Sequence, residues 1–165
     1  MIQIRQNIFE TNSSSVHALV IPNDQSIHIP NRVSLSGGEY GWENDVDDDT
    51  LDYFYQACLD RGREEVDKFF NYLKRKGVEE INAPEIHWVK SEWNGREYEY
   101  ADNNDGYIDH ASDVPLEDLF ANETLLDMFL FGDSSYIRTG NDNSDMDWCD
   151  ELESTEDAKV LWKYN

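Results

Sequence analysis

The chain has 165 residues, and its 36 acidic residues far outnumber its 13 lysines and arginines, which gives a formal net charge of −23 at pH 7. This length is enough for one domain with a hydrophobic core. The charge repels DNA, RNA and anionic membranes, so it excludes direct nucleic-acid binding and membrane attachment and favours basic partners.

Cysteine content and hydropathy predict a soluble cytoplasmic protein. Two cysteines, Cys58 and Cys149, are too few for the disulfide framework of a small secreted domain. The first ten residues alternate polar and apolar side chains and lack the apolar core of a signal peptide. The longest apolar runs, Ala18–Ile21 and Met128–Phe131, are far too short to span a bilayer.

Short strands are predicted in the N-terminal third. Apolar residues between Ile2 and Phe9 indicate an opening strand, and Val16–Ile21 indicates a second. Two further strands are predicted at Ser26–Ile29 and Arg32–Leu35. Together they predict a small β-meander, which ends at the glycines of Ser36–Gly38.

Three helical segments follow from apolar periodicity. Leu51–Arg61 is preceded by Asp49 and Thr50 as candidate caps and ends at Gly62, and Glu64–Lys76 ends at Gly77. Pro115–Phe131 is the third helical segment, and Asn122 is the point at which it could break.

The strongest local prediction is a β-hairpin. Glu85–Trp93 alternates, Asn94-Gly95 is the favoured two-residue turn, and Arg96–Tyr100 returns. Ile86 and Trp88 are expected on one face with Tyr98 or Tyr100. Segments 39–49, 102–113 and 140–153 are predicted loops, Ser135–Thr139 is a predicted strand, and Ala158–Tyr164 is a closing element of undetermined type.

These elements predict one α+β domain over residues 1–165. Its antiparallel sheet would consist of the N-terminal meander and the Asn-Gly hairpin, packed against three or four helices.

Acidic and aromatic residues are interleaved in two of the predicted loops. A disordered acidic tail would lack this aromatic content, so we expect a folded surface that holds negative charge in fixed positions. Aromatic side chains beside the acids could anchor a partner. The alternative that the charge serves only solubility stays open. The candidate partner-binding residues are Tyr40, Trp42, Glu43, Asp45, Asp47, Asp48 and Asp49 in the first loop and Asp142, Asp145, Asp147, Trp148, Asp150 and Glu151 in the second.

No metal or other cofactor is predicted. Asn143, Asp145 and Asp147 have the spacing of a calcium loop, but Trp148 stands where that loop requires glycine. The four histidines are isolated, and the sequence has neither a His-Glu-x-x-His nor a Cys-x-x-Cys motif.

Three polar segments could instead meet as an enzyme site: Thr11–His17, Asp109-His110 and Asn141–Asn143. If they do, their side chains should lie close together around a cleft. Nothing resembles the Gly-x-Ser-x-Gly motif or a phosphate-binding glycine loop, so an enzyme is less favoured than a binding protein. The candidate catalytic residues are Ser13, Ser15, His17, Asp109, His110 and Asp142.

The segment Asn7–His17, which contains Phe-Glu-Thr-Asn-Ser-Ser-Ser-Val-His, resembles an N-terminal signature of uncharacterised proteins of Firmicutes phages and mobile elements. Gly106–His110 and Ser135–Asn143 resemble stretches of the same group. The resemblance implies a phage or mobile-element setting and brings no established activity. Small acidic proteins in that setting are often inhibitors of host restriction or CRISPR enzymes, which is an analogy of class.

Carboxylates on a rigid scaffold can stand in for phosphates on a basic surface. The hypothesis from sequence is therefore an acidic protein that inhibits a bacterial nucleic-acid-binding defence protein, such as a CRISPR or restriction enzyme, by nucleic-acid mimicry in the host cytoplasm. The alternative is a small phage enzyme that uses the three polar segments.

Overall fold

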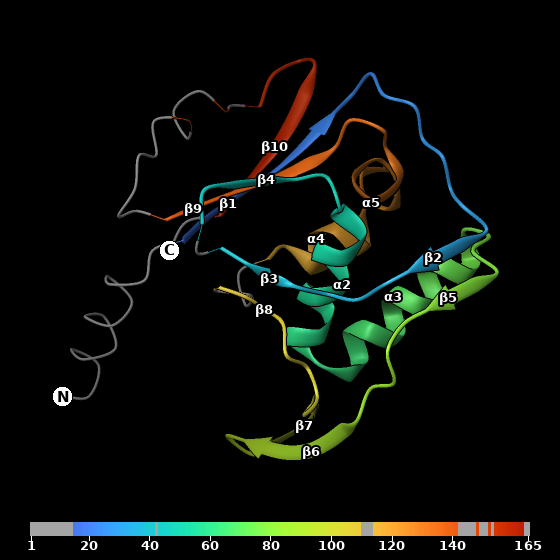
Figure 1. The fold of residues 1–165 in the computed structure, drawn as a ribbon, viewed down its shortest axis with the longest axis vertical. Helices are drawn as coiled ribbons and strands as arrows, with labels where there is room; N and C mark the ends of the chain where they lie inside the picture. The colour runs from blue at the N-terminus through green and yellow to red at the C-terminus, as the bar shows by residue number, and fades with distance from the viewer. Residues whose placement is uncertain are drawn as a thin grey trace.

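The computed structural model describes residues 15–41, 43–109, 114–141, 148, 152 and 154–163. Four helices lie on one side of a four-stranded antiparallel sheet, and smaller strand pairs flank the helices (Figure 1). The α+β class predicted from the sequence is confirmed. None of the described helices is long and apolar enough to cross a bilayer.

The central sheet joins segments from both halves of the sequence. Its order is β10 (Ala158–Lys163), β1 (Ser15–Pro22), β9 (Tyr136–Asn141) and β4 (Asp45–Asp47), and each pair is antiparallel. Side chains on β1 alternate between the two faces of the sheet. Leu19 and Ile21 enter the main core beneath the helices, whereas Val16, Ala18 and Val20 pack on the opposite face with Trp148 and Val160.

The predicted N-terminal meander is wrong. β2 (Arg32–Ser34) pairs in parallel with β5 (Glu80–Asn82), and Ser26–Ile29 contributes only an isolated bridge between Ile27 and Gly132. The parallel pairing places Val33 in the main core and brings the guanidinium of Arg32 within 2.6 Å of a carboxylate oxygen of Glu80. The opening strand predicted between Ile2 and Phe9 lies outside the described residues.

Two segments predicted as loops contain a second parallel pair. β3 (Glu39–Tyr40) lies beside β8 (Tyr107–Ile108), and the amide of Asp109 donates to the carbonyl of Tyr40 at 2.9 Å. These strands are too short to give a periodic signal in the sequence.

Helix α2 (Thr50–Arg61) lies at the centre of the molecule (Figure 1). Asp49 caps it by accepting a hydrogen bond from the Asp52 amide at 3.1 Å, and Gly62 follows its last residue with a φ of 121°. Residues 53–59 are all buried, so α2 has no solvent-facing side along its middle. Its capping was predicted correctly.

The remaining helices also follow the sequence prediction. α3 (Arg63–Arg75) packs against α2, and the third helical segment divides at Asn122 into α4 (Leu116–Ala121) and α5 (Glu123–Phe131). Asn122 causes this break because its side chain accepts a hydrogen bond from the Leu125 amide and so caps α5.

The Asn-Gly hairpin is present as β6 (Trp88–Trp93) and β7 (Arg96–Ala101), and it projects at the lower end of the molecule in Figure 1. Asn94 and Gly95 have φ values of 50° and 76°, as this turn requires. The predicted face is wrong. Trp88 lies opposite Ala101, whereas Tyr98 lies opposite Ser91, because the turn fixes a register that places Trp88 and the tyrosines on opposite faces.

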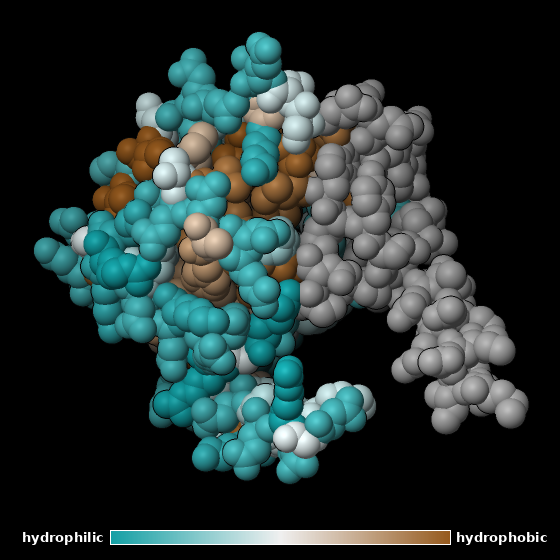
Figure 2. Space-filling view, turned by 180° about the vertical axis from the view of Figure 1, so that it is seen from behind, coloured by the Kyte–Doolittle hydropathy of each residue, from teal (hydrophilic) through white to brown (hydrophobic). Residues whose placement is uncertain are grey.

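Aromatic rings fill the space between the helices. Phe54 of α2 is fully buried and makes edge-to-face contacts with Phe69 of α3 and with Phe120 and Phe129 of α4 and α5. Hydrophilic residues cover most of the face seen from behind, and the hydrophobic residues visible on it gather in its upper half (Figure 2).

Candidate functional site

The first acidic segment is held in place by the central sheet. We call Glu43, Asp45, Asp47, Asp48 and Asp49 the acidic edge. β4 forms the outer strand of the sheet here, and its register sets Asp45 opposite Thr139 and Asp47 opposite Ile137 of β9. A segment predicted as a loop therefore contains a paired strand whose alternate residues carry carboxylates on one face.

Local hydrogen bonds fix the backbone of the acidic edge. The Thr139 hydroxyl donates to the carbonyl of Glu43 at 2.9 Å. The Asp49 amide donates to Oδ1 of Asp47 at 2.8 Å, and Asp49 in turn caps α2. Asp47 is half-buried and the other four acidic side chains are exposed, so the acidic edge is an ordered row of negative charge.

A cavity of about 250 Å³ opens beside this row. Tyr40 and Tyr107 line it from the β3–β8 pair, and the buried residues Ile137 and Thr139 line it from β9. Four carboxylates border it: Glu39, Glu43, Asp45 and Asp47. Within the described ranges, no three histidine, cysteine or acidic side chains are grouped so that they could hold a metal ion.

The negative field of the acidic edge reaches the neighbouring tyrosine. Partial burial raises the pKa of Tyr40 well above its usual value, and the charges of Asp47, Asp52 and Asp49 raise it further. The pKa of Asp49 is also raised, first by partial burial, although the hydrogen bond from the Asp52 amide lowers it. Tyr40 therefore remains a neutral hydrogen-bonding group among carboxylates.

His17 and Asp109, which come from two of the polar segments, meet at Gly41. A Cβ atom built on Gly41 would lie 2.9 Å from the Asp109 Cβ and 2.9 Å from Nε2 of His17. Gly41 also has a φ of 114°, a conformation that favours glycine. The absence of a side chain at Gly41 therefore lets the histidine and the aspartate approach the same point.

Helix α2 contributes a third group at this point. The hydroxyl of Tyr53 lies 3.4 Å from Nδ1 of His17, and both side chains are buried. Tyr53 packs edge-to-face on Tyr40, with ring centroids 5.1 Å apart. Burial raises the pKa of Tyr53 far above its usual range, so it stays neutral.

The sheet register connects His17 with the acidic edge. His17 lies opposite Thr139, which lies opposite Asp45, so these three residues form one row across β1, β9 and β4. Ser15 pairs with Asn141 in a parallel row of the same sheet. The other predicted catalytic residues, Ser13, His110 and Asp142, lie outside the described residues.

In the second acidic segment, residues 140 and 141 belong to β9, and beyond them the structure describes only Trp148 and Leu152. Trp148 is 6% exposed and packs on the outer face of the sheet, where the guanidinium carbon of Arg138 lies 4.6 Å from the centre of its ring. Its side chain thus faces the protein interior and does not present an exposed anchor. Trp42, Asp145, Asp147, Asp150 and Glu151 lie outside the described residues.

Sequence reasoning missed four residues of this site: Glu39, Gly41, Tyr53 and Thr139. Gly41 was the one recognisable position, because an isolated glycine can mark a positive φ or a close approach of the backbone. Nothing in the sequence pointed to Tyr53, because it lies on a helix that is buried on nearly every side and has no single apolar face.

No family model, curated protein or solved structure matches this chain. The functional proposal therefore depends on the charge and geometry of the described residues.

Proposed function

We propose that this protein binds the basic, nucleic-acid-binding surface of a bacterial protein and inhibits it by nucleic-acid mimicry. A phage or mobile-element protein of this kind would act on a host defence protein such as a restriction or CRISPR enzyme. The observation that supports the proposal is the acidic edge, where hydrogen bonds and strand pairing hold exposed carboxylates in a fixed row.

Fixed carboxylates suit this role for a physical reason. A basic groove binds nucleic acid largely because its lysines and arginines neutralise phosphates and release counterions. Asp45 and Asp47 point to the same side of β4, and neighbouring side chains on one side of a strand are about 6.6 Å apart. Because the backbone is already ordered, binding does not require ordering of the acidic segment.

Apolar surface beside the acids can add affinity. Val46 lies between two aspartates and is 57% exposed, and Tyr107 of the β3–β8 pair is also exposed at the rim of the cavity. Val46 and Tyr107 therefore replace Trp148 as the described candidates for apolar anchors at a partner interface.

The test begins with partners captured from a bacterial lysate at low salt and continues with each purified partner. Labelled duplex DNA bound to that partner should be displaced by the protein, and displacement should weaken steeply as salt is raised. The proposal is contradicted if the partner holds DNA and this protein together with no loss of affinity for either.

A triple variant isolates the contribution of the acidic edge. Asp45→Asn, Asp47→Asn and Asp48→Asn together should weaken displacement by about tenfold or more, because each lost interfacial charge contributes on the order of 0.5–1 kcal/mol. The matched control neutralises Glu64, Glu65 and Asp67 on α3, which removes the same net charge elsewhere. Equal losses in both variants would show that only total charge matters.

A second candidate function, a small enzyme, is favoured by the meeting of His17, Asp109 and Tyr53 at Gly41. Histidine beside a carboxylate is a common acid–base arrangement. His17 is only 2% exposed, which supports a packing role equally well. If the protein hydrolyses any substrate in a panel of nucleotides, phosphodiesters and peptides, His17→Asn and Asp109→Asn should each abolish turnover. Unchanged turnover in both variants would exclude this site.

A further inference from the structure

The β6–β7 hairpin has one covered edge and one open edge. β7 packs against α2 and α3, where a Cβ atom built on Gly62 would lie 2.7 Å from the Glu99 carbonyl oxygen, and the Glu99 carboxylate lies 3.3 Å from the Arg63 guanidinium. Among the described strands, β6 pairs with β7 alone. A two-stranded sheet gains stability from a third strand, and the edge of β6 is where one can add.

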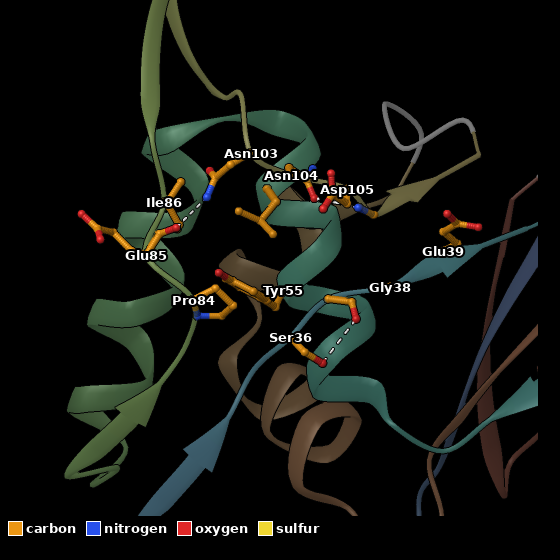
Figure 3. A pocket seen from close by; sticks show the side chains of 13 residues that line it. Ser36, Gly38, Glu39, Tyr55, Pro84, Glu85, Ile86, Asn103, Asn104 and Asp105 are labelled. Atoms are coloured by element: carbon orange, nitrogen blue, oxygen red, sulfur yellow. Dashed lines mark hydrogen bonds between the residues drawn. The ribbon is translucent and has the colours of Figure 1, made fainter.

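The base of the hairpin is fixed to the rest of the molecule. The Asn103 side chain donates to the Glu85 carbonyl at 2.8 Å and accepts from the His87 amide at 2.9 Å. Figure 3 shows the first of these bonds at the rim of a cavity of about 400 Å³. Because the hairpin is held in this way, β6 is ordered before any partner binds. The residues that line the cavity are 36–39, 84–86 and 103–106, together with Tyr55 and Leu59 of α2.

The backbone groups of β6 alternate between its two edges. In a hairpin with a two-residue turn, the residues that flank the turn form a hydrogen-bonded pair, and every second pair after it is hydrogen-bonded too. The flanking residues here are Trp93 and Arg96, so Ser91 also bonds to β7. Lys90 and Glu92 lie between these positions, and their amide and carbonyl groups therefore point away from β7. Among the described residues, neither amide donates to a backbone carbonyl outside the hairpin.

The side chains of β6 separate by face. Val89, Ser91 and Trp93 lie on one face, and Lys90 and Glu92 lie on the other. Trp93 is 71% exposed, and both charged side chains are exposed as well. All carboxylates of β6 and β7 lie on the face of Lys90 and Glu92. The face with Trp93 is therefore free of negative charge, although the chain as a whole carries a net charge of −23.

The order Lys90-Ser91-Glu92 makes β6 complementary to a second copy of itself. When two β6 strands lie antiparallel with Ser91 opposite Ser91, Lys90 of each copy faces Glu92 of the other. The same register places Val89 opposite Trp93 on the other face, and both kinds of cross-strand pair are favourable. It also sets the outward backbone groups of Lys90 against those of Glu92, as an antiparallel ladder requires. One register thus satisfies backbone, charge and apolar contacts together.

We infer that two copies of this protein associate through their β6 edges, with two-fold symmetry, into one antiparallel sheet in the order β7-β6-β6-β7. Pairing of a six-residue strand buries less than the roughly 800 Å² per partner of a stable interface, so the dimer is weak. The hairpin lies at the lower end of the molecule in Figure 1 and β4 lies in its upper part. The acidic edge therefore takes no part in the contact, and the inference does not depend on the proposed inhibition.

Sedimentation of the full-length protein tests the inference. The weight-average mass should rise from 19.3 kDa toward twice that value as the protein concentration approaches about 1 mM. Repulsion between the two acidic bodies opposes association, and raising the salt concentration from about 0.15 M to about 1 M shortens the screening length from about 8 Å to about 3 Å. Association should therefore be stronger at high salt. A single 19.3 kDa species under all these conditions overturns the inference.

An exchange of charges tests the register. Lys90→Glu sets a glutamate against Glu92 at both symmetric positions and should weaken association about tenfold. Lys90→Glu with Glu92→Lys should restore the wild-type dissociation constant. The matched control combines Lys90→Glu with Glu79→Lys, an exposed position near β5, so it recovers the net charge but not the pair and should stay weak. Wild-type association in Lys90→Glu, or equal association of the two double variants, overturns the inference.

A pair of proline variants tests the edge. Glu92→Pro removes an amide that points outward from β6, which an edge strand can tolerate, and should abolish association. Glu97→Pro removes the outward amide of the residue directly opposite, on the covered edge of β7, and should associate like the wild type. Both variants lose one carboxylate, so their net charges are equal. Equal association of the two variants overturns the inference.

Discussion

Replacement of Phe54 by alanine should lower the free energy of unfolding by about 3–5 kcal/mol. The Phe54 ring is fully buried on α2 and contacts rings from three other helices, so its removal leaves a cavity that no single neighbour can fill. Urea denaturation followed by circular dichroism would measure the loss.

The control for Phe54→Ala is Trp93→Ala. Trp93 lies on the projecting hairpin and is 71% exposed, so its removal should change the free energy of unfolding by no more than about 0.5 kcal/mol. If the two variants were equally stable, α2 would not be the centre of the core.

Gly41→Ala should lower the free energy of unfolding by about 2–5 kcal/mol. Two effects combine. A left-handed φ of 114° strains any residue with a Cβ by about 1–2 kcal/mol, and the new methyl group would approach His17 and Asp109 too closely, which adds about 1–3 kcal/mol.

Gly77→Ala separates these two effects. Gly77 has a φ of 100°, but a Cβ built there would meet no atom within 4 Å, so this variant carries the backbone strain alone. The free energy of unfolding of both variants would be measured in the same urea titration. Equal losses would mean that the approach of His17 and Asp109 to Gly41 is not tightly constrained.

The helices and the hairpin were predictable because their signals are local. Asp49 and Gly62 bound α2, Asn122 divides α4 from α5, and Asn94-Gly95 fixes the hairpin turn. Each signal acts within a few residues of the element it defines, so one sequence contains all the information required.

Strand partners were not predictable in the same way. The alternating apolar residues around Val33 predict a strand but do not identify its partner strand. Tertiary packing alone places Val33 beside Ile81 in a parallel pair. β4 was even harder to predict than β2, because Asp45 and Asp47 have low strand propensity and become extended only through pairing with β9. The acidic edge was therefore identified by charge, while its ordered backbone was not foreseen.

The candidate site was predicted in part. The polar segments suggested that His17 and Asp109 could approach each other, and the structure places both beside Gly41. The cavity lined by residues 36–39, 84–86 and 103–106 and by helix α2 was not foreseen, because its lining residues come from four separate parts of the chain.

The position of β1 between β9 and β10 has a consequence for biosynthesis. As the chain leaves the ribosome, β1 emerges before its two neighbours, which follow the four described helices in the sequence, so both hydrogen-bonding edges of β1 are open until then. Nascent chains that wait for distant strands are prone to pair with one another. Acidic residues outnumber basic residues in the sequence between these strands, and mutual repulsion among nascent chains would keep the open edges of β1 apart until β9 and β10 arrive.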